Sequence, residues 1–533
     1  MPETVVAATA AQESQSALAP LRLPVFRMLW FTWLAANTTM WMNDVASAWL
    51  MTSIAPSPLW VALVQSASTL PVFLLGLPSG AFADILDRRR YFMATQFWVA
   101  GVSIVTAALV LTGTMNAPLL LALTFLNGIG LAMRWPVFAA IVPELVPRGQ
   151  LPSALALNGV AMNSSRIIGP LLAGALIAGA GSGWVFLLNA LLSIVAGFVI
   201  MRWRREHRES PLGRERLSSA IRVGVQYVWQ SGRIRAILLR IALFFLHSTA
   251  LLALLPLIAR SLPGGAAGTF TILLAAMGAG AITSALSMQR VRRVMQLQAI
   301  VFAGTALQAA AAIVVAFAPS IYVAVPGMFV AGGAWLAVAN SLTVATQMAL
   351  PDWVRARGMS IYQMALMGST AAGAALWGQV ATWTNIHDAV LIAALSSTVL
   401  MFAAQRLVID RGIEEDLSPS DAIKAPHAEA PPRTGRILVQ IEYRIDPART
   451  EEFLQVMQES RRSRMSQGAL DWQVVRDLYD PARIVEHIVD ESWTEHLRRF
   501  DRVTQSDVAL RDRKLSFHVG DAPPVVTRYL IER

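Results

Sequence analysis

The sequence contains no cysteine, and this absence excludes disulfide bonds, thiolate metal sites and iron–sulfur clusters. Lysine is almost missing too: Lys424 and Lys514 are the only two, and neither stands in the Gly-x-x-x-x-Gly-Lys loop that binds nucleotide phosphates. ATP hydrolysis by this chain is therefore excluded, and we expect no metal and no cofactor. Residues 1–22 lack the basic-then-apolar order of a cleavable signal, and we expect them to form a disordered cytoplasmic tail.

Charged residues are also scarce, at 15% of the 533 residues, whereas 55% are hydrophobic. The apolar residues gather in runs of about twenty, each long enough at about 1.5 Å per residue to cross a hydrocarbon core of roughly 30 Å. We expect an all-α polytopic membrane protein with twelve transmembrane helices, at 26–52, 59–83, 91–112, 117–139, 153–179, 183–203, 236–260, 267–289, 297–317, 320–345, 358–381 and 387–409.

Arginine marks every second connection between these runs. The basic connections hold Arg88 to Arg90, Arg148, the stretch 202–235, Arg290 to Arg293, and Arg355 with Arg357, while those near 53–58, 112–117, 180–183 and 317–320 carry no charge. Short arginine-rich loops stay in the cytoplasm, so the pattern places both termini there, in a multi-pass protein of the bacterial inner membrane. The same loops account for the net charge of +10, and we expect contact with membrane lipid but not with nucleic acid.

The two halves of the membrane region, 23–203 and 236–410, resemble each other. A shift of 204 residues lays Pro147 on Pro351, Gly169 on Gly373, and Gly174 on Gly378. Parallel six-helix halves of this kind are an architecture of secondary transporters. The connection 204–235 repeats apolar residues at helical spacing among arginines, which predicts a basic amphipathic helix on the inner membrane surface.

The composition changes after residue 410. Residues 411–435 are rich in proline and read as a flexible linker. From 436 to 533 we expect a soluble α+β domain: a strand from 437, a helix to about 465, strands near 470–478 and 482–490, a charged helix from Trp493, and a strand at 525–531. This βαββαβ order is the ferredoxin-like pattern.

The connection between the second and third runs reads Gly80-Ala-Phe-Ala-Asp84-Ile-Leu-Asp87-Arg88-Arg89-Arg90. An acidic residue at the end of a helix, followed by clustered arginines, can form a charge latch. Asp84 would face the positive N-terminal end of the helix that starts near 358, and the arginines would pair with Glu144 or with the aspartates. Alternatively, the arginines only set the topology.

This loop resembles the signature G-x-x-x-D-R-x-G-R-R of the major facilitator superfamily, and four residues match it: Gly80, Asp84, Arg88 and Arg89. Ile85 and Asp87 depart from it, standing where the family usually has Arg and Gly. The Asp variant resembles the branch that contains the enterobactin exporter. So does the segment 142–148 with the residues that follow it, Asn158, Asn163, Arg166, Gly169 and Pro170. The resemblance covers about 22–410 and implies the major facilitator fold.

Few ionisable residues lie inside the predicted spans, and each is a functional candidate because an unpaired charge in the bilayer is costly. Arg166 would serve a central cavity, pair with Asp44, or pair structurally across helices. Asp44 would carry a proton, form a gate, or be exposed at the interface. His247 would titrate near neutrality or be merely hydrogen-bonded. Arg134, near the cytoplasmic end of its span, is predicted to be an anchor.

Aromatic and small residues supply the remaining candidates for the transport pathway. Trp41 and Trp377 would line a cavity for an amphipathic ligand, with Asn163 beside the pathway, or the two indoles would belong to packing and interface belts.

The run from Gly169 and Pro170 to Gly174 resembles the antiporter signature of the fifth helix. It would allow close helix approach and bending, or simply ordinary packing. Thr124 stands where drug/proton antiporters generally place Arg, which puts their standard proton coupling in doubt.

Over about 436–531 the chain resembles the antibiotic-biosynthesis monooxygenase-like domains, which usually pair through their sheets. Its scattered aromatic and histidine residues could line a cleft: Trp472, Tyr479, His487, Trp493, His496 and His518. Ligand sensing or homodimer formation is favoured over catalysis.

These observations predict a secondary transporter, and not an enzyme. It would export small amphipathic molecules, siderophore-like or drug-like, by alternating access with the proton as coupling ion. The alternative is a membrane-tethered ligand sensor, or a cofactor-free monooxygenase, that acts through the C-terminal domain.

Overall fold

The structure is a computed structural model that describes residues 18–55, 57–147, 150–203, 217–407, 416–420, 422–424, 426 and 435–532. The chain folds as two compact units. The first comprises Met1–Glu209, Leu239–Thr343 and Gln363–Leu407, and the second comprises Ser210–Leu238, Val344–Tyr362 and Val408–Arg533. Most of the tail predicted at 1–22 and of the linker predicted at 411–435 lies outside the described residues.

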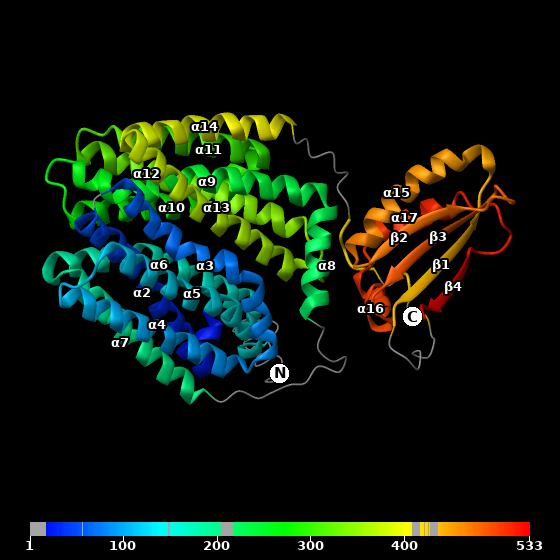
Figure 1. The fold of residues 1–533 in the computed structure, drawn as a ribbon, viewed down its shortest axis with the longest axis horizontal. Coiled ribbons are helices and arrows are strands. Elements are labelled where there is room, and N and C mark those ends of the chain that lie inside the picture. Colours follow the sequence, from blue (N-terminus) through cyan, green and yellow to red (C-terminus); the bar gives the residue numbers. More distant parts are fainter. Residues whose placement is uncertain are drawn as a thin grey trace, which may run out of the picture. The chain divides into compact units, whose positions relative to one another are not determined.

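Long helices that run side by side build the first unit (Figure 1). Each of the twelve predicted apolar runs overlaps one helix, because a continuous apolar run without interior charge favours a single helix that satisfies its own backbone hydrogen bonds. The helices of the first half are α2 (Pro24–Ile54), α3 (Pro58–Ile85), α4 (Arg88–Leu111), α5 (Ala117–Leu145), α6 (Leu151–Ala180) and α7 (Ser182–Arg202). Those of the second half are α9 (Gly232–Ser261), α10 (Ala267–Val294), α11 (Leu297–Ala316), α12 (Ile321–Met348), α13 (Arg355–Trp383) and α14 (Ile386–Leu407).

Ten helices in the described part of the chain are long and apolar enough to cross a membrane: α3 to α7, α9 to α12, and α14. The other two, α2 with 31 residues and α13 with 29, are equally long but contain no comparably apolar stretch of 18 residues. In α2 the difference comes from polar side chains that are buried inside the bundle, such as Asn37, Asn43 and Ser47. A polar residue is tolerated in such a helix where it faces protein or a polar cavity instead of lipid.

Buried polar side chains join the helices of the first half. The Asn189 amide of α7 donates to Ser103 Oγ of α4 at 2.9 Å and to Asn43 Oδ1 of α2 at 3.4 Å. The Asn127 amide of α5 reaches the same Ser103 hydroxyl at 3.5 Å. Hydrogen bonds of this kind hold helices together where the hydrophobic effect does not distinguish lipid from protein.

On α6, two glycines of the internal repeat allow neighbouring helices to come close. A Cβ added at Gly169 would lie 2.6 Å from Trp41 Cβ of α2, and one added at Gly174 would collide with Thr271 of α10. The first glycine therefore meets the first helix of its own half, and the second meets the second helix of the other half.

The equivalent glycines on α13 have equivalent neighbours. A Cβ at Gly373 would collide with the Leu246 backbone of α9, and one at Gly378 would lie 2.6 Å from Ala62 Cβ of α3. Again the first glycine contacts the first helix of its own half, and the second contacts the second helix of the other half. The offset of 204 residues thus corresponds to two matching contacts between the halves.

The second unit contains a four-stranded antiparallel sheet with strand order β2-β3-β1-β4. Its strands are β1 (Ile437–Arg444), β2 (Asp471–Arg476), β3 (Arg483–Asp490) and β4 (Val525–Leu530), and its longer helices are α15 (Thr450–Ser466), α16 (Trp493–Arg498) and α17 (Gln505–Leu515). Side chains alternate along β3, and its buried set faces α15 and α17, as the contacts of Glu486 with Ser460 and Lys514 show.

The charged helix expected from Trp493 is broken into two. Between α16 and α17 lies a short 3-10 turn, η4 (Phe500–Arg502). Thr504 then begins α17, because its side chain accepts from the Asp507 backbone N–H while the Asp507 carboxylate accepts from the Thr504 backbone N–H. This reciprocal capping box sets a new helix start within a continuous charged stretch.

The amphipathic helix expected within 204–235 is α8 (Leu217–Gln230), and it belongs to the second unit. Val223, Tyr227 and Val228 are buried, whereas Val225 and Trp229 are exposed. Residues 204–216 lie outside the described part of the chain.

Candidate functional site

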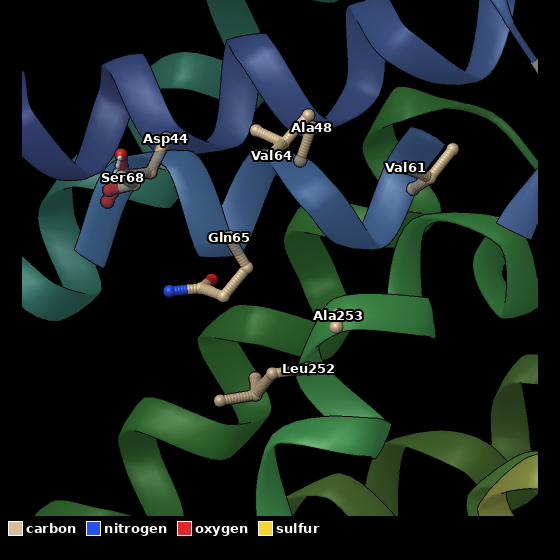
Figure 2. A pocket seen from close by; sticks show the side chains of 8 residues that line it. All are labelled: Asp44, Ala48, Val61, Val64, Gln65, Ser68, Leu252 and Ala253. Carbon is tan, nitrogen blue, oxygen red and sulfur yellow. Dashed lines mark hydrogen bonds between the residues drawn. The ribbon is translucent and has the colours of Figure 1, made fainter. Parts of the chain in front are cut away.

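A hollow in the first unit lies between α2, α3 and α9 (Figure 2). It has about 260 Å³ of empty space, part of it open to solvent. Figure 2 shows Gln65 and Leu252 extending into the same opening, while Asp44 and Ser68 point toward one another. The lining residues are Asp44, Ala48, Val61, Val64, Gln65, Ser68, Leu252 and Ala253.

Asp44 is the ionisable residue of this hollow. Its carboxylate accepts a hydrogen bond from Ser68 Oγ at 3.0 Å. Among the described residues, no Arg, Lys or His nitrogen lies within 4 Å of it, so Asp44 has no ion-pair partner there. A carboxylate inside a helical bundle that is open to a hollow and lacks a fixed counter-ion can take up and release a proton or a cationic group.

Arg166 of α6 lies between two indole rings from different halves. Its guanidinium carbon is 5.3 Å from the ring centroid of Trp41 on α2 and 4.2 Å from that of Trp335 on α12. Both distances suit a cation–π interaction. The pairing of Arg166 with Asp44 that the sequence left open is not formed in this structure, because no Asp44 oxygen lies within 4 Å of the guanidinium.

Helix geometry places the hollow around Asp44 next to the indole contacts of Arg166. Trp41 and Asp44 are three residues apart on α2, so they lie on one face of that helix. Trp335 also packs edge-on against Phe245 of α9, with ring centroids 5.5 Å apart. The aromatic cluster therefore draws on both halves of the bundle. Sequence reasoning did not select Trp335, Gln65 or Ser68, because their importance comes only from what the fold brings to them.

His247 and Trp377 meet each other on α9 and α13, with ring centroids 5.6 Å apart. Both are buried, and each is hydrogen-bonded to the α9 backbone: His247 Nδ1 lies 2.7 Å from Leu243 O, and Trp377 Nε1 donates to Leu246 O at 2.9 Å. Neither residue lines the hollow around Asp44. Their contacts fix α13 to α9, beside the close approach at Gly373.

Arg134 is buried, with 3% of its surface exposed, rather than reaching toward the membrane surface as an anchor would. Its guanidinium donates to Ala36 O at 3.4 Å and lies 5.5 Å from the Trp33 ring centroid. The Trp33 ring in turn stacks on Phe138 at 3.9 Å. Arg134 thus ties α5 to α2 inside the first half.

The loop expected to form the latch shows two local contacts. Asp87 caps α4, its carboxylate accepting from the Arg90 backbone N–H at 2.8 Å, and Arg89 donates to the Met201 carbonyl at the end of α7. The candidate position Gly80 and the side chains of Asp84, Glu144 and Asn163 lie outside the described part of the structure. Pro170 lies inside α6, where a proline removes one backbone hydrogen bond.

The C-terminal domain holds a buried carboxylate at Glu486, which is fully enclosed. Burial raises its pKa, but the charges of Lys514 and Arg464 and the hydrogen bonds from Trp472 and Ser460 outweigh burial and lower the pKa to about 2. Its partners are Lys514 Nζ at 3.3 Å, Tyr443 OH at 3.1 Å, and Ser460 Oγ and Trp472 Nε1, both at 2.9 Å.

Of the aromatic and histidine residues expected in a cleft of this domain, Trp493 and His496 lie against each other, with ring centroids 5.4 Å apart, and the contacts of the others differ. Trp472 binds Glu486, His487 lies 3.0 Å from the Gln440 amide, and His496 Nδ1 lies 2.7 Å from Asp490. His518 accepts from the Arg444 backbone N–H, and Tyr479 is 98% exposed. The described residues contain no group of three or more His, Asp or Glu that could hold a metal ion.

Comparison with known sequences gives one family match and several partial relatives. A family model described as "Transmembrane secretion effector" matches residues 15–533. Proteins named for multidrug resistance, MdtD of Salmonella typhi and of Salmonella paratyphi B, are each 32% identical over 152 residues, which is 28% of this chain and 31% of the relative. The chain therefore matches less than a third of the length of these relatives.

Solved structures share the fold at low sequence identity. A bacterial homologue of the human lysosomal transporter Spinster, in an inward-facing and unoccupied conformation, aligns with a TM-score of 0.58 at 14% identity over 72% of this chain and 95% of its own. The nucleoside transporter NupG aligns with a TM-score of 0.53 at 14% identity, over 73% and 100%.

These structural likenesses show the fold alone. The family match extends through the C-terminal domain, so this domain is part of the family's chain and not an addition to it. The transporter prediction is thereby confirmed at the level of family. Because the family model covers nearly the whole sequence, the protein belongs to the transmembrane secretion effector family of the major facilitator transporters.

Proposed function

We propose that the protein exports small amphipathic molecules, siderophore-like or drug-like, across the bacterial inner membrane in exchange for protons. One observation carries the proposal: within the described part of the chain, Asp44 has no ion-pair partner in its hollow, and it lies one helical turn from an aromatic cluster shared by both halves. The indole faces suit the apolar part of such a molecule, and the Asp44 carboxylate suits its cationic or polar part. The partial relatives named for multidrug resistance support the substrate class.

Twelve spans with both termini in the cytoplasm are part of this proposal. The helices α2 and α13 have 31 and 29 residues, about 45 Å at 1.5 Å per residue, which is long enough to cross the bilayer. Their polar character fits helices that face an interior pathway. With these two helices added to the ten apolar ones, the arginine-rich connections all fall on one side of the membrane.

Alternating access would use the two matching contacts between the halves. The Gly174 contact joins α6 to α10, and the Gly378 contact joins α13 to α3. Rocking of one half against the other would loosen one side of the bundle while these close contacts guide the motion. The Arg166 contact with Trp335 also crosses between the halves, and we expect it to open in one of the two states.

Protons are the proposed source of energy. A proton that crosses 100 mV releases about 2.3 kcal/mol, which sustains a concentration ratio of roughly fiftyfold. If a cationic substrate and a proton compete for Asp44, the two cannot occupy the site together. Such competition couples the movement of protons in one direction to the movement of substrate in the other.

At the cytoplasmic ends of the helices, we propose that Asp84, Arg88 and Glu144 form the latch expected from the loop signature. The contact of Arg89 with the end of α7 supports a role of this loop in holding helix ends together.

Two further proposals concern the fold and the pairing of the C-terminal domain. Its βαββαβ order and its strand order are those of a ferredoxin-like fold, and we infer that it has this fold. Exposed apolar residues on the sheet face away from α15 and α17 include Val475, Val525 and Tyr529, and they support a homodimer through this face. Since the family is one of transporters, we favour ligand sensing over monooxygenase activity as a second function of this domain.

Transport of ethidium, an amphipathic aromatic cation, into proteoliposomes tests the proposal. With an acidic interior, the protein should accumulate ethidium, and an uncoupler should abolish the accumulation. Asp44→Asn should remove the dependence on the pH gradient, whereas Asp388→Asn, an exposed aspartate that caps α14 with Asn385, should retain it. Accumulation that ignores the gradient, or that survives in Asp44→Asn, would contradict the assignment.

A further inference from the structure

Helix α8 makes polar contacts with the C-terminal domain within the second unit. The Arg222 guanidinium donates to Glu491 Oε2 at 2.7 Å and to Gly468 O at 3.0 Å. Ser219 Oγ donates to the same Glu491 carboxylate at 2.9 Å. One turn further on, the Gln226 amide donates to Ala469 O at 3.3 Å. These donors lie along one face of α8, and their acceptors follow directly after the ends of α15 and β3.

The turn after α15 is shaped for this approach. Gly468 has φ of +109°, a conformation that L side chains rarely adopt. A Cβ at this position would lie 2.8 Å from Val223 Cγ2 and 3.0 Å from Arg502 Nη1. Val223 is fully buried in this contact. Glycine at position 468 therefore allows both the positive φ of the turn and the close packing of the turn against α8.

A second contact involves the connection between α12 and α13. The Arg502 guanidinium carbon of the C-terminal domain lies 5.3 Å from the ring centroid of Trp353. The same indole packs edge-on against Tyr227 of α8 at 5.6 Å, and Tyr227 OH donates to Ala349 O at 3.4 Å. Trp353 is thus held between α8 and the C-terminal domain.

The two segments that the domain contacts lead directly into transporter helices. Only Ser231 separates α8 from α9, and α13 begins at Arg355, two residues after Trp353. The helices α9 and α13 are those that approach each other at Gly373 and carry the contact of His247 with Trp377. A single body bound to the starts of both helices opposes any change in their separation.

We propose that the C-terminal domain is a reversible clamp on the transport cycle: when it binds α8 and Trp353, it restrains α9 and α13 and slows alternation. The regulatory part of this inference rests on the proposed function. The ion pair suits reversible binding because both partners are partly exposed, at 27% for Arg222 and 33% for Glu491, and partly exposed pairs are screened by salt.

Charge reversal in the full-length protein tests the clamp. Glu491→Arg places two cations against each other, and Arg222→Glu combined with Glu491→Arg restores an opposite pair. Glu451→Lys, an exposed acid in the first turn of α15 (Thr450–Ser466), serves as the control. Hydrogen exchange of α8 should speed up severalfold in Glu491→Arg, return toward the original rate in the double variant, and stay unchanged in the control.

A labelling assay measures the restraint without any substrate. Because the chain has no cysteine, Gln65→Cys in the hollow gives a single reporter for a membrane-impermeant maleimide. We expect the cysteine to be labelled severalfold faster when Glu491→Arg is added than when Arg222 and Glu491 are both present. In the double variant, the labelling rate should return to the value of the parent protein. Equal α8 exchange in all variants would overturn the contact, and faster exchange with unchanged labelling would overturn the clamp. Either failure is distinguishable from failure of ethidium transport, which tests the proposed function.

Discussion

Replacing Gly169 by alanine is the sharpest test of the packing between α2 and α6. The added Cβ would lie 2.6 Å from Trp41 Cβ and 2.9 Å from Thr38 O. Favourable contacts between carbon atoms lie at about 3.5–4.0 Å, so the helices must separate by about 1 Å. Both opposing atoms are close to or part of the α2 backbone, and no flexible side-chain end can move aside. The clash must therefore displace a helix.

The magnitude follows from two opposing contributions. Overpacking of a tight contact destabilises by about 1–3 kcal/mol, whereas alanine in place of glycine favours a helix by about 0.8–1.0 kcal/mol. We therefore expect Gly169→Ala to lower the free energy of unfolding by up to about 2 kcal/mol. Gly159 lies on the same helix, and a Cβ there would meet no atom within 4 Å. Gly159→Ala should keep only the helix gain of up to about 1 kcal/mol.

Thermal unfolding of the purified variants in the same detergent, followed by tryptophan fluorescence, measures this difference. Gly169→Ala should unfold at a lower temperature than the parent, and Gly159→Ala at an equal or higher one. If both variants shift equally and in the same direction, α2 and α6 are not in close contact at Gly169, and Gly169 and Gly373 do not make equivalent contacts in the two halves. Ethidium transport should also be slower in Gly169→Ala, because the displaced helix carries Trp41 and Asp44.

Three further predictions concern the two units separately. Glu486→Gln leaves Lys514 buried without its anion and should destabilise the C-terminal domain by about 3–5 kcal/mol, seen as faster hydrogen exchange along β3. Because the folded-state pKa of Glu486 is lowered from 4.5 to about 2, its stabilisation should be complete above pH 4.5 and disappear as the pH falls toward 2, which the same exchange measured against pH would detect. Trp335→Ala removes the nearer ring from Arg166 and should raise the KM for ethidium, while Trp229→Ala, an exposed indole of α8, should leave KM unchanged.

Most helices could be predicted from the sequence because a span needs a long apolar run, and the lipid environment imposes this requirement directly. A different signal predicted the other elements: apolar residues at helical spacing indicated α8, and alternating apolar residues indicated strands of the C-terminal domain. The break between α16 and α17 was missed, because the capping box at Thr504 and Asp507 decides it within a stretch whose charge pattern continues.

The site could be predicted only in part. Arg166 and Asp44 were selected because a charge in a bilayer span needs an explanation, and that reasoning needs no partner. Their neighbours were not predictable, since Trp335 is far from Arg166 along the chain and Ser68 is an ordinary polar residue in an apolar helix. A single sequence shows which residues are unusual for a membrane span, but the contacts between those residues become visible only in the folded structure.

Two long helices that lack a strongly apolar stretch of 18 residues, α2 and α13, supply several of the residues singled out in this bundle. α2 contributes Trp41 and Asp44, and α13 contributes Gly373 and Gly378. The two helices differ from a uniformly apolar span for different physical reasons. A helix that faces a pathway, as proposed for α2, keeps polar groups. A helix that packs closely on two partners, such as α13, needs small residues. In a transporter, a long helix with weak hydropathy between strongly apolar neighbours is therefore a sign of the pathway, and substitutions there should affect transport more than substitutions on the lipid-facing helices.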